Sequence, residues 1–386
     1  PVWNRWCLSG ITHRSAQVLF MLLAMDPRLT TFHVMSNTFG EYLRITTWGE
    51  SHGPGIGVVL DGLPAGLPVT PELLQQQLKR RRPGGDLASP RKEPDEPMIL
   101  SGVYEGKTLG TPVSIYIESS DVRSSDYDSI SEIYRPGHAD FTTEARYGHR
   151  DPRGGGRASA RETAARVAAG AIAAEFLRLE HGIEIVGWVS ELAGTRAPVE
   201  IEKITREEVD SSLVRCPHED TSSEFVAAVS QARDEGESLG GWVGVVARGV
   251  PAGWGDPVFG KLKAWIGQAM LSIPATVAIE IGDGIAATGK TGGENNDAFG
   301  LTEEGEIAPA TNRSGGLLGG ISSGAPIWLR VGFKPTSTIR RSQKSVKKSG
   351  EEVQFSGTGR HDPCVLPRAV PIVESMLALV LADRFL

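Results

Sequence analysis

Short apolar runs separated by glycine-rich turns recur along the chain from Thr38 onward. Runs of this length, rich in Val and Ile and bounded by glycine, are typical of β-strands. The strands predicted in this way are Ile56–Leu60, Val113–Ile117, Ile183–Val189, Val243–Ala247, Val277–Ile281 and Ile327–Val331.

Three other segments have helical patterns. Pro71–Arg81 follows Thr70, a suitable N-cap with proline at the first helical position. Ser159–Leu179 is rich in alanine, and its opening Ser-x-x-Glu predicts a capping box with Glu162. Pro371–Phe385 carries an apolar stripe at helical spacing.

Two long stretches between these elements have neither pattern. Arg82–Pro97 contains four prolines among many charges, and Lys334–Gly359 is basic and rich in Ser and Thr. Long irregular loops in a compact domain are usually functional or disordered. Because the chain shows no repeats and no clear boundary, we expect a single large α+β domain.

The first 34 residues differ from the rest. Ala16–Met25 is the longest apolar candidate and is too short to span a membrane. It resembles a weak signal peptide, but no small-x-small cleavage site follows it. We therefore expect residues 1–34 to be an extension outside the fold and residues 35–386 to form the folded domain.

The composition is that of a soluble globular protein, with 40% hydrophobic and 23% charged residues. The net charge of −7 gives no support for nucleic-acid binding, so an anion site has to come from local clusters of Arg and Lys. Cys7, Cys216 and Cys364 are widely spaced without a CxxC motif. This argues against a disulfide framework or a metal site and fits a reducing cytoplasm.

The densest cationic stretch is RPGHADFTTEARYGHRDPRGGGRASARETAAR, residues 135–166. Guanidinium groups bind phosphate and carboxylate bidentately. Gly154–Gly156 leads into a predicted helix N-terminus, where backbone N–H groups and the helix dipole favour anions. These features favour an anion or cofactor site over surface arginines beside a flexible turn. Lys79–Arg82 forms a second cluster at a helix C-terminus, where cations are also stabilising in their own right.

Two histidines lie in glycine-rich turns, His52 in GESHGPG and His138 in RPGHAD. Histidine there suits proton transfer near neutral pH, although many loop histidines are simply exposed. In GRHDP, Asp362 lies near Arg360, which keeps a carboxylate ionised; the alternative is a plain Asp-Pro turn.

Gly284–Thr291 matches the P-loop pattern GxxxxGK[ST] and follows a predicted strand. A P-loop has to open a helix, whereas the following GGENNDAFG has no helical periodicity. A P-loop phosphotransferase is therefore retained only as an alternative.

Seven motifs together resemble the chorismate synthase family over about Thr38–Leu386, in the order found in that family. They are GESHG, RRRPG, RPGHAD, GGGRASARETAARVAAGAIA, GGISSG, KPTST and GRHDPC, which begin at residues 49, 80, 135, 154, 319, 334 and 359.

The resemblance implies a β-α-β sandwich, a homotetramer, and an anti 1,4-elimination of phosphate from 5-enolpyruvylshikimate 3-phosphate to give chorismate. This lyase reaction is the last common step of the shikimate pathway to aromatic amino acids, and it requires reduced FMN without net redox change. No Rossmann GxGxxG follows a predicted strand. We therefore expect a separate flavin reductase, with NADPH as an indirect reductant. From the net charge and the short apolar runs we expect no nucleic-acid or membrane partner.

By the same resemblance, His138 protonates the departing phosphate, His52 protonates the reduced flavin near N1, and Asp362 accepts the substrate proton through flavin N5. Ser51 and Ser159 poise that region by hydrogen bonding. The substrate-binding positions carried over are Arg80, Arg81, Arg135, Arg161 and Arg360. The FMN-binding positions carried over are Arg157, Ala158, Ser159, Pro274, Ala275, Gly319, Lys334, Pro335, Thr336, Ser337, Thr338 and Arg360.

This chain departs from the family pattern at three positions. Ala158 and Thr338 stand where many members have Ser, and Leu87 stands where many have a further Arg. Only Leu87 removes a charge, whose role would pass to Arg91 or Lys92 unless one substrate contact is missing. A non-catalytic flavin- or anion-binding protein is therefore the second alternative.

Overall fold

The computed structural model describes residues 37–82, 87, 93–120, 131–303, 305–357 and 362–386. Residues 1–34, Arg91, Lys92 and Arg360, for which predictions were made, lie outside the described residues.

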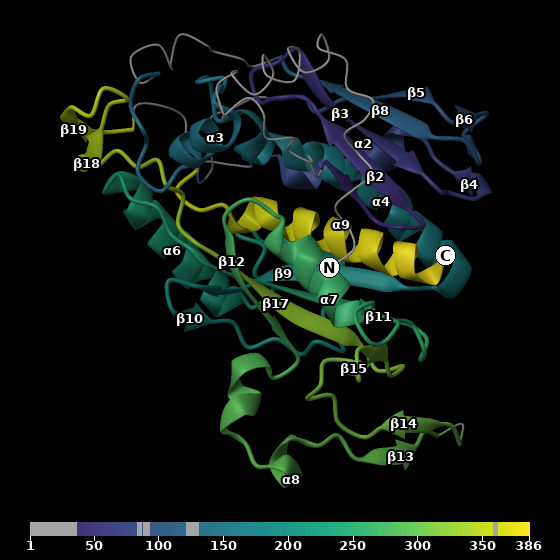
Figure 1. Ribbon diagram of the computed structural model, residues 1–386. Helices are drawn as coiled ribbons and strands as arrows, with labels where there is room; N and C mark the ends of the chain where they lie inside the picture. Colours follow the sequence, from purple (N-terminus) through teal and green to yellow (C-terminus); the bar gives the residue numbers. More distant parts are fainter. Residues whose placement is uncertain (1–36, 83–86, 88–92, 121–130, 304, 358–361) are drawn as a thin grey trace, which may run out of the picture.

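Two five-stranded antiparallel sheets enclose a layer of helices between them (Figure 1). The first sheet has the order β1-β2-β3-β8-β5 and the second the order β10-β9-β11-β17-β12. The strands of the first sheet are β1 (Thr38–Phe39), β2 (Arg44–Trp48), β3 (Gly55–Asp61), β8 (Val113–Glu118) and β5 (Pro97–Ser101). Those of the second are β10 (Thr195–Arg196), β9 (Glu184–Leu192), β11 (Gly241–Arg248), β17 (Ile327–Phe333) and β12 (Thr276–Ile281).

The helical layer consists of α2 (Pro71–Arg81), α4 (Thr163–His181) and α9 (Leu366–Phe385), and α7 (Leu262–Leu271) packs on α9. Helices α4 and α9 bury side chains on almost every face, as expected of helices covered on both sides. The chain therefore forms a β-α-β sandwich, and the predicted fold class is confirmed.

Smaller elements connect these layers and extend from them. The remaining helices are α3 (Asp140–Tyr147), α5 (Arg206–Ser211), α6 (Glu219–Asp234), α8 (Gly292–Asn295) and the 3₁₀ turns Gly156–Ala158, Ala160–Glu162 and Gly284–Gly289. The remaining strands are β4 (Ala65–Pro68), β6 (Val103–Tyr104), β7 (Lys107–Leu109), β13 (Phe299–Leu301), β14 (Ile307–Pro309), β15 (Leu317–Leu318), β16 (Ile321–Ser322), β18 (Gln343–Val346) and β19 (Glu352–Phe355).

All six predicted strands are confirmed, as β3, β8, β9, β11, β12 and β17. Helix α2 has the predicted bounds, and the Thr70 hydroxyl accepts a hydrogen bond from the Leu73 N–H as its N-cap.

The predicted start of α4 is wrong. The Ser159 hydroxyl accepts a hydrogen bond from the Arg161 N–H and caps the 3₁₀ turn, and the α-helix begins at Thr163. Glu162 forms no capping box, because its carboxylate pairs with Arg166 instead.

Two further predictions need correction. Helix α9 begins at Leu366 rather than Pro371, since Pro367 occupies its first turn, where proline is favourable, and the helix continues through Pro371. The segment Lys334–Gly359 is not wholly irregular, because it contains the β18–β19 hairpin. This hairpin bridges to Ile133 through Lys347.

The helical layer is held by close packing and by a buried ion pair. Gly170 of α4 faces Ser375 of α9, and a Cβ atom on Gly170 would lie 2.2 Å from the Ser375 Cβ. Arg80 of α2 pairs with Glu374 of α9, which also accepts a 2.8 Å hydrogen bond from the Gly187 N–H of β9. Among the described residues, no helix is long and apolar enough to cross a membrane.

We predict that Gly170→Ala destabilises the fold by about 1–3 kcal/mol, because the added methyl group overpacks the α4–α9 contact. Gly267→Ala on α7 is the matched control. A Cβ atom there meets no atom within 4 Å. The control is expected to stabilise the protein by about 0.5–1 kcal/mol through helix propensity. Urea unfolding of both variants measures the difference, and equal stabilities would contradict this account of the contact.

Candidate active site

A cavity of about 530 Å³ lies where three helices of the middle layer end. The C-terminus of α2 contributes Arg81, the 3₁₀ turn before α4 contributes Ser159 and Arg161, and the first turns of α9 contribute Arg368 and Ile372. The N-termini of two buried helices thus border one cavity, and their dipoles favour anions there.

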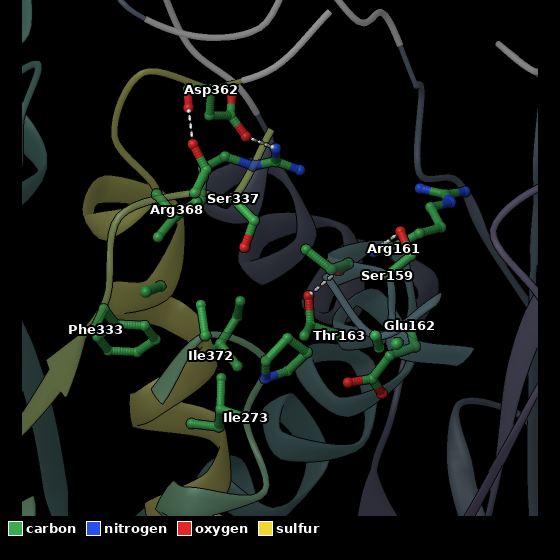
Figure 2. Close-up of a pocket in the computed structure, with 18 of the residues that line it drawn as sticks. Ser159, Arg161, Glu162, Thr163, Ile273, Phe333, Ser337, Asp362, Arg368 and Ile372 are labelled. Atoms are coloured by element: carbon green, nitrogen blue, oxygen red, sulfur yellow. Dashed lines mark hydrogen bonds and ion pairs between the residues drawn. The ribbon is translucent and has the colours of Figure 1, made fainter. Parts of the chain in front are cut away.

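One wall of the cavity is apolar. Figure 2 shows Phe333, Ile372 and Ile273 along one side, with Ser159 and Arg161 across from them. Polar groups that converge on an apolar wall are typical of cofactor and substrate pockets.

Most of the predicted site residues line this one cavity although they are distant in the sequence. They are Arg81, Arg135, His138, Arg157, Ala158, Ser159, Arg161, Pro274, Ala275, Lys334, Pro335, Thr336, Ser337, Thr338 and Asp362.

Arg81 and Arg161 are held side by side by one carboxylate. Asp95 is fully buried and accepts a 2.9 Å hydrogen bond from Arg81 Nη1, while its other oxygen pairs with Arg161 Nη1. Burial by itself would raise the pKa of Asp95, but the two guanidinium charges outweigh it and lower that pKa. Burial also lowers the pKa of Arg81 to about 10, against the attraction of Asp95.

Arg135 and His138 share a second buried carboxylate, Asp140. Arg135 donates to both oxygens of Asp140, at 2.7 Å from Nε and 2.6 Å from Nη2, and His138 Nδ1 lies 3.0 Å from Oδ1. Burial would raise the pKa of Asp140, but the hydrogen bonds from Arg135 and His138 outweigh it and hold that pKa far below its usual range. Asp140 is therefore ionised at any working pH.

The glycine run lies between the two predicted histidines. A Cβ atom on Gly154 would lie 2.1 Å from His52 Nδ1, and one on Gly155 would lie 2.8 Å from His138 Cε1. Both glycines also have positive φ angles, so the backbone conformation disfavours a side chain in addition to these close contacts. His52 and Ser51, joined by a 3.1 Å hydrogen bond, are buried behind Gly154 and not in the cavity wall itself.

The segment that follows β17 ties the remaining walls together. Lys334 Nζ and the Ser337 hydroxyl donate to the Gly137 carbonyl, at 2.7 and 2.6 Å, beside His138. The Thr336 hydroxyl donates to the Asp362 carbonyl at 3.0 Å. The Asp362 carboxylate pairs with Arg368 (Figure 2).

Two predicted site residues, Arg80 and Gly319, lie elsewhere, as does Leu87, the position where many family members have an arginine. Arg80 is buried against Glu374 and Asp210. Gly319 lies in the β15–β16 turn, and neither residue is among those that line the cavity. Leu87 packs against the hydrophobic core and is likewise not a described lining residue.

Several residues of the site are not predicted by the sequence pattern. Arg368 is not predicted as a site residue, because the predicted helix Pro371–Phe385 begins after it. Asp95 is not predicted, because it lies in a proline-rich stretch without a periodic pattern. Arg166, which pairs with Glu162, was treated as part of a general cationic stretch. Asp140 could have been found, since RPGHAD places it two residues after His138.

The P-loop alternative has no structural support. Gly284–Gly289 forms a 3₁₀ turn, Lys290 pairs with Asp283, and the helix that follows spans only Gly292–Asn295. Within the described part of the chain, no group of three or more His, Cys, Asp or Glu side chains could hold a metal ion.

Comparisons with known proteins agree with one another. The model of the chorismate synthase family matches residues 43–386. Chorismate synthase of Trichormus variabilis is 53% identical over 353 residues, which cover 91% of this chain and 98% of that protein. Its counterpart from Synechocystis sp. is 52% identical over the same shares of both chains. A crystal structure of chorismate synthase matches with a TM-score of 0.72 at 33% identity, covering 89% of this chain and 92% of that one.

We predict that Asp95→Asn destabilises the protein by about 3 kcal/mol at neutral pH, because it leaves two buried guanidinium groups without a carboxylate. The lowered pKa of Asp95 means that its stabilising effect is present above about pH 4 and is lost as the pH falls further. Thermal unfolding of both proteins at neutral and acidic pH measures this. The difference in stability between the wild type and Asp95→Asn should narrow on acidification. A difference that stays constant would show that Asp95 does not act through its charge.

Proposed function

The chain belongs to the chorismate synthase family, lyases of aromatic amino-acid biosynthesis, and we propose that it eliminates phosphate from 5-enolpyruvylshikimate 3-phosphate to give chorismate. The observation that carries this proposal is the gathering of six arginines and a lysine around one cavity in a chain of net charge −7. The arginines are Arg81, Arg135, Arg157, Arg161, Arg166 and Arg368, and the lysine is Lys334.

The guanidinium group of Arg166 binds Glu162 and the hydroxyl and carbonyl of Ser272. The proposed substrate carries two carboxylates and a phosphate, so it needs several cations at once. We propose Arg81, Arg135 and Arg161 as its contacts, together with Arg360. Arg80 is not retained as a contact, because it does not line the cavity and its guanidinium group is buried against Glu374 and Asp210.

We propose reduced FMN as the cofactor, and the chain's own residues suit it. The cavity volume of about 530 Å³ lies within the range of ligand pockets. Its apolar wall suits a flat ring, and Gly154 and Gly155 leave the space that His52 and His138 occupy. Arg157, Ser159 and the segment Lys334–Thr338 would hold the cofactor, with Ala158, Pro274 and Ala275 beside it. When bound, reduced FMN supplies an electron transiently to the substrate.

The remaining chemistry is assigned to three groups of this chain. His138 protonates the departing phosphate, which neutralises the charge that develops on it. Asp362, whose carboxylate pairs with Arg368, takes the C6 proton of the substrate. His52 holds a proton behind Gly154, next to Ser51.

We also propose a homotetramer in the cytoplasm, supplied with reduced flavin by a separate reductase that draws on NADPH. Exposed apolar side chains support association between copies. They gather on β12, the following 3₁₀ turn and the β13–β14 hairpin, as Val277, Ile285, Phe299, Leu301 and Ile307. Residues 35–386 form the proposed catalytic domain, and residues 1–34 are proposed to lie outside it.

The reaction is tested by anaerobic incubation of the protein with 5-enolpyruvylshikimate 3-phosphate and photoreduced FMN. We expect stoichiometric release of phosphate and chorismate, and no release with oxidised FMN. FMN binding without turnover would instead indicate a non-catalytic flavin-binding protein. ATP is the control ligand, and the proposed function predicts no effect of ATP on thermal unfolding.

We predict that His138→Ala lowers kcat by roughly two to four powers of ten, the usual contribution of a general acid. FMN binding should remain nearly unchanged, because the residues proposed to hold the cofactor are intact. Phosphate release and flavin fluorescence titration measure the two effects separately. An unchanged rate would remove His138 from the proposed role.

A further inference from the structure

We infer that Asp140 is a positioning residue, which keeps one proton on His138 Nδ1 and so places the transferable proton on Nε2. This inference rests on the proposed function for the role of that second proton. The contact between Asp140 and His138 does not depend on it.

Asp140 is the centre of a compact network. Its side chain is 3% exposed and lies at the first position of α3. Oδ2 accepts hydrogen bonds from the backbone N–H and Nε of Arg135, at 3.1 and 2.7 Å, while Oδ1 faces Arg135 Nη2 and His138 Nδ1. Both oxygens are therefore engaged, and the carboxylate has a single orientation.

Two groups compete for the same nitrogen of His138. Arg135 Nη2 lies 3.1 Å from Nδ1, and Asp140 Oδ1 lies 3.0 Å from it. A guanidinium group can only donate and an ionised carboxylate can only accept, so Nδ1 cannot satisfy both. Arg135 Nη2 has two N–H groups and donates one of them to Asp140 at 2.6 Å. An unprotonated Nδ1 would set its lone pair against the anionic Oδ1 at 3.0 Å, whereas an Nδ1–H group donates to that oxygen. We therefore assign the carboxylate as the partner of Nδ1. Nδ1 therefore carries a proton.

The opposite side of the ring faces the glycine run. A Cβ atom on Gly155 would lie 3.0 Å from His138 Nε2, so only a glycine backbone leaves space there. With Nδ1–H donated to Asp140, protonated His138 has one other proton, on Nε2. Transfer breaks this N–H bond and forms an O–H bond on the phosphate. The neutral ring keeps its proton on Nδ1 and still donates it in a hydrogen bond to Asp140.

The charged groups around this network come from several elements. Arg150 Nη1 lies 3.6 Å from Asp140 Oδ1, and Glu144 of α3 accepts a 3.1 Å hydrogen bond from Arg150 Nε. Lys348 of the hairpin lies 3.2 Å from Glu144, and Lys334 binds the Gly137 carbonyl. Among the described residues, Asp140 is the carboxylate that contacts His138.

The test compares Asp140→Asn with Glu144→Gln, a matched control that removes a second carboxylate from α3 without touching His138. In Asp140→Asn the amide nitrogen would meet two Arg135 donors at the Oδ2 position but only one, Nη2, at the Oδ1 position. We therefore expect it to take the Oδ1 position, to face His138 and to donate to Nδ1. The neutral ring should then carry its proton on Nε2. The ¹⁵N imidazole signals of His138, assigned by their loss in His138→Gln, report this change directly.

We expect neutral His138 to be Nδ1-protonated in the wild type and in Glu144→Gln, and Nε2-protonated in Asp140→Asn. We also expect kcat to fall roughly ten- to a hundredfold in Asp140→Asn, less than on removal of the acid itself. Asp140→Glu, which keeps a carboxylate, should keep the Nδ1 proton and recover part of kcat. If Asp140→Asn folds poorly, Asp140→Glu provides the test in its place.

Two results would overturn the inference: an Nε2-protonated ring in the wild type, or an Asp140→Asn protein with the wild-type tautomer and rate. A wild-type protein without turnover would remove the proposed function instead. The ¹⁵N signals would then still show whether Asp140 fixes the Nδ1 proton, so the two failures can be told apart.

Discussion

The site depends on burying positive charge without losing it. Like charges that are withdrawn from water repel one another and lower each other's pKa, so each needs an acceptor nearby. The protein supplies one for each cavity arginine: Asp95 for Arg81 and Arg161, Asp140 for Arg135, and Asp362 for Arg368. Arg157 is held by the carbonyl groups of Thr47 and Gly49. The cations are thereby fixed in place before any ligand arrives, which lowers the cost of ordering them on binding.

The layered fold explains why these groups meet. Two sheets cover the central helices on both faces, so the ends of the helices are where their polar termini can meet a ligand. At the cavity the N-termini of α4 and α9 add their dipoles to the arginine charges. The same end of the layer receives the loop of His138 and the segment after β17. One architectural boundary thus collects motifs from five distant parts of the chain.

Much of this could be predicted from the sequence, because strands, helix α2 and the glycine-rich motifs have local patterns. The rest depends on tertiary contacts. Arg80 and Arg81 are adjacent and look alike, but neighbouring helical residues point about 100° apart. Arg81 therefore reaches the cavity, whereas Arg80 reaches Glu374 in α9. Asp95 has a positive φ angle of 46° in a segment without periodicity, and only the positions of its two arginine partners reveal its role.

The position of α9 in the chain has a consequence for biosynthesis. Residues 366–385 fill the middle of the sandwich, yet they follow every strand of both sheets. Helix α9 packs on β9 and β11 of the second sheet. During synthesis on the ribosome, this part of the inner face of the second sheet stays uncovered until α9 has emerged. Exposed apolar surface of that kind promotes aggregation. Final folding therefore waits for α9, and the apolar surface needs to be shielded until then. The element that completes the site is also the one that ends this vulnerable period.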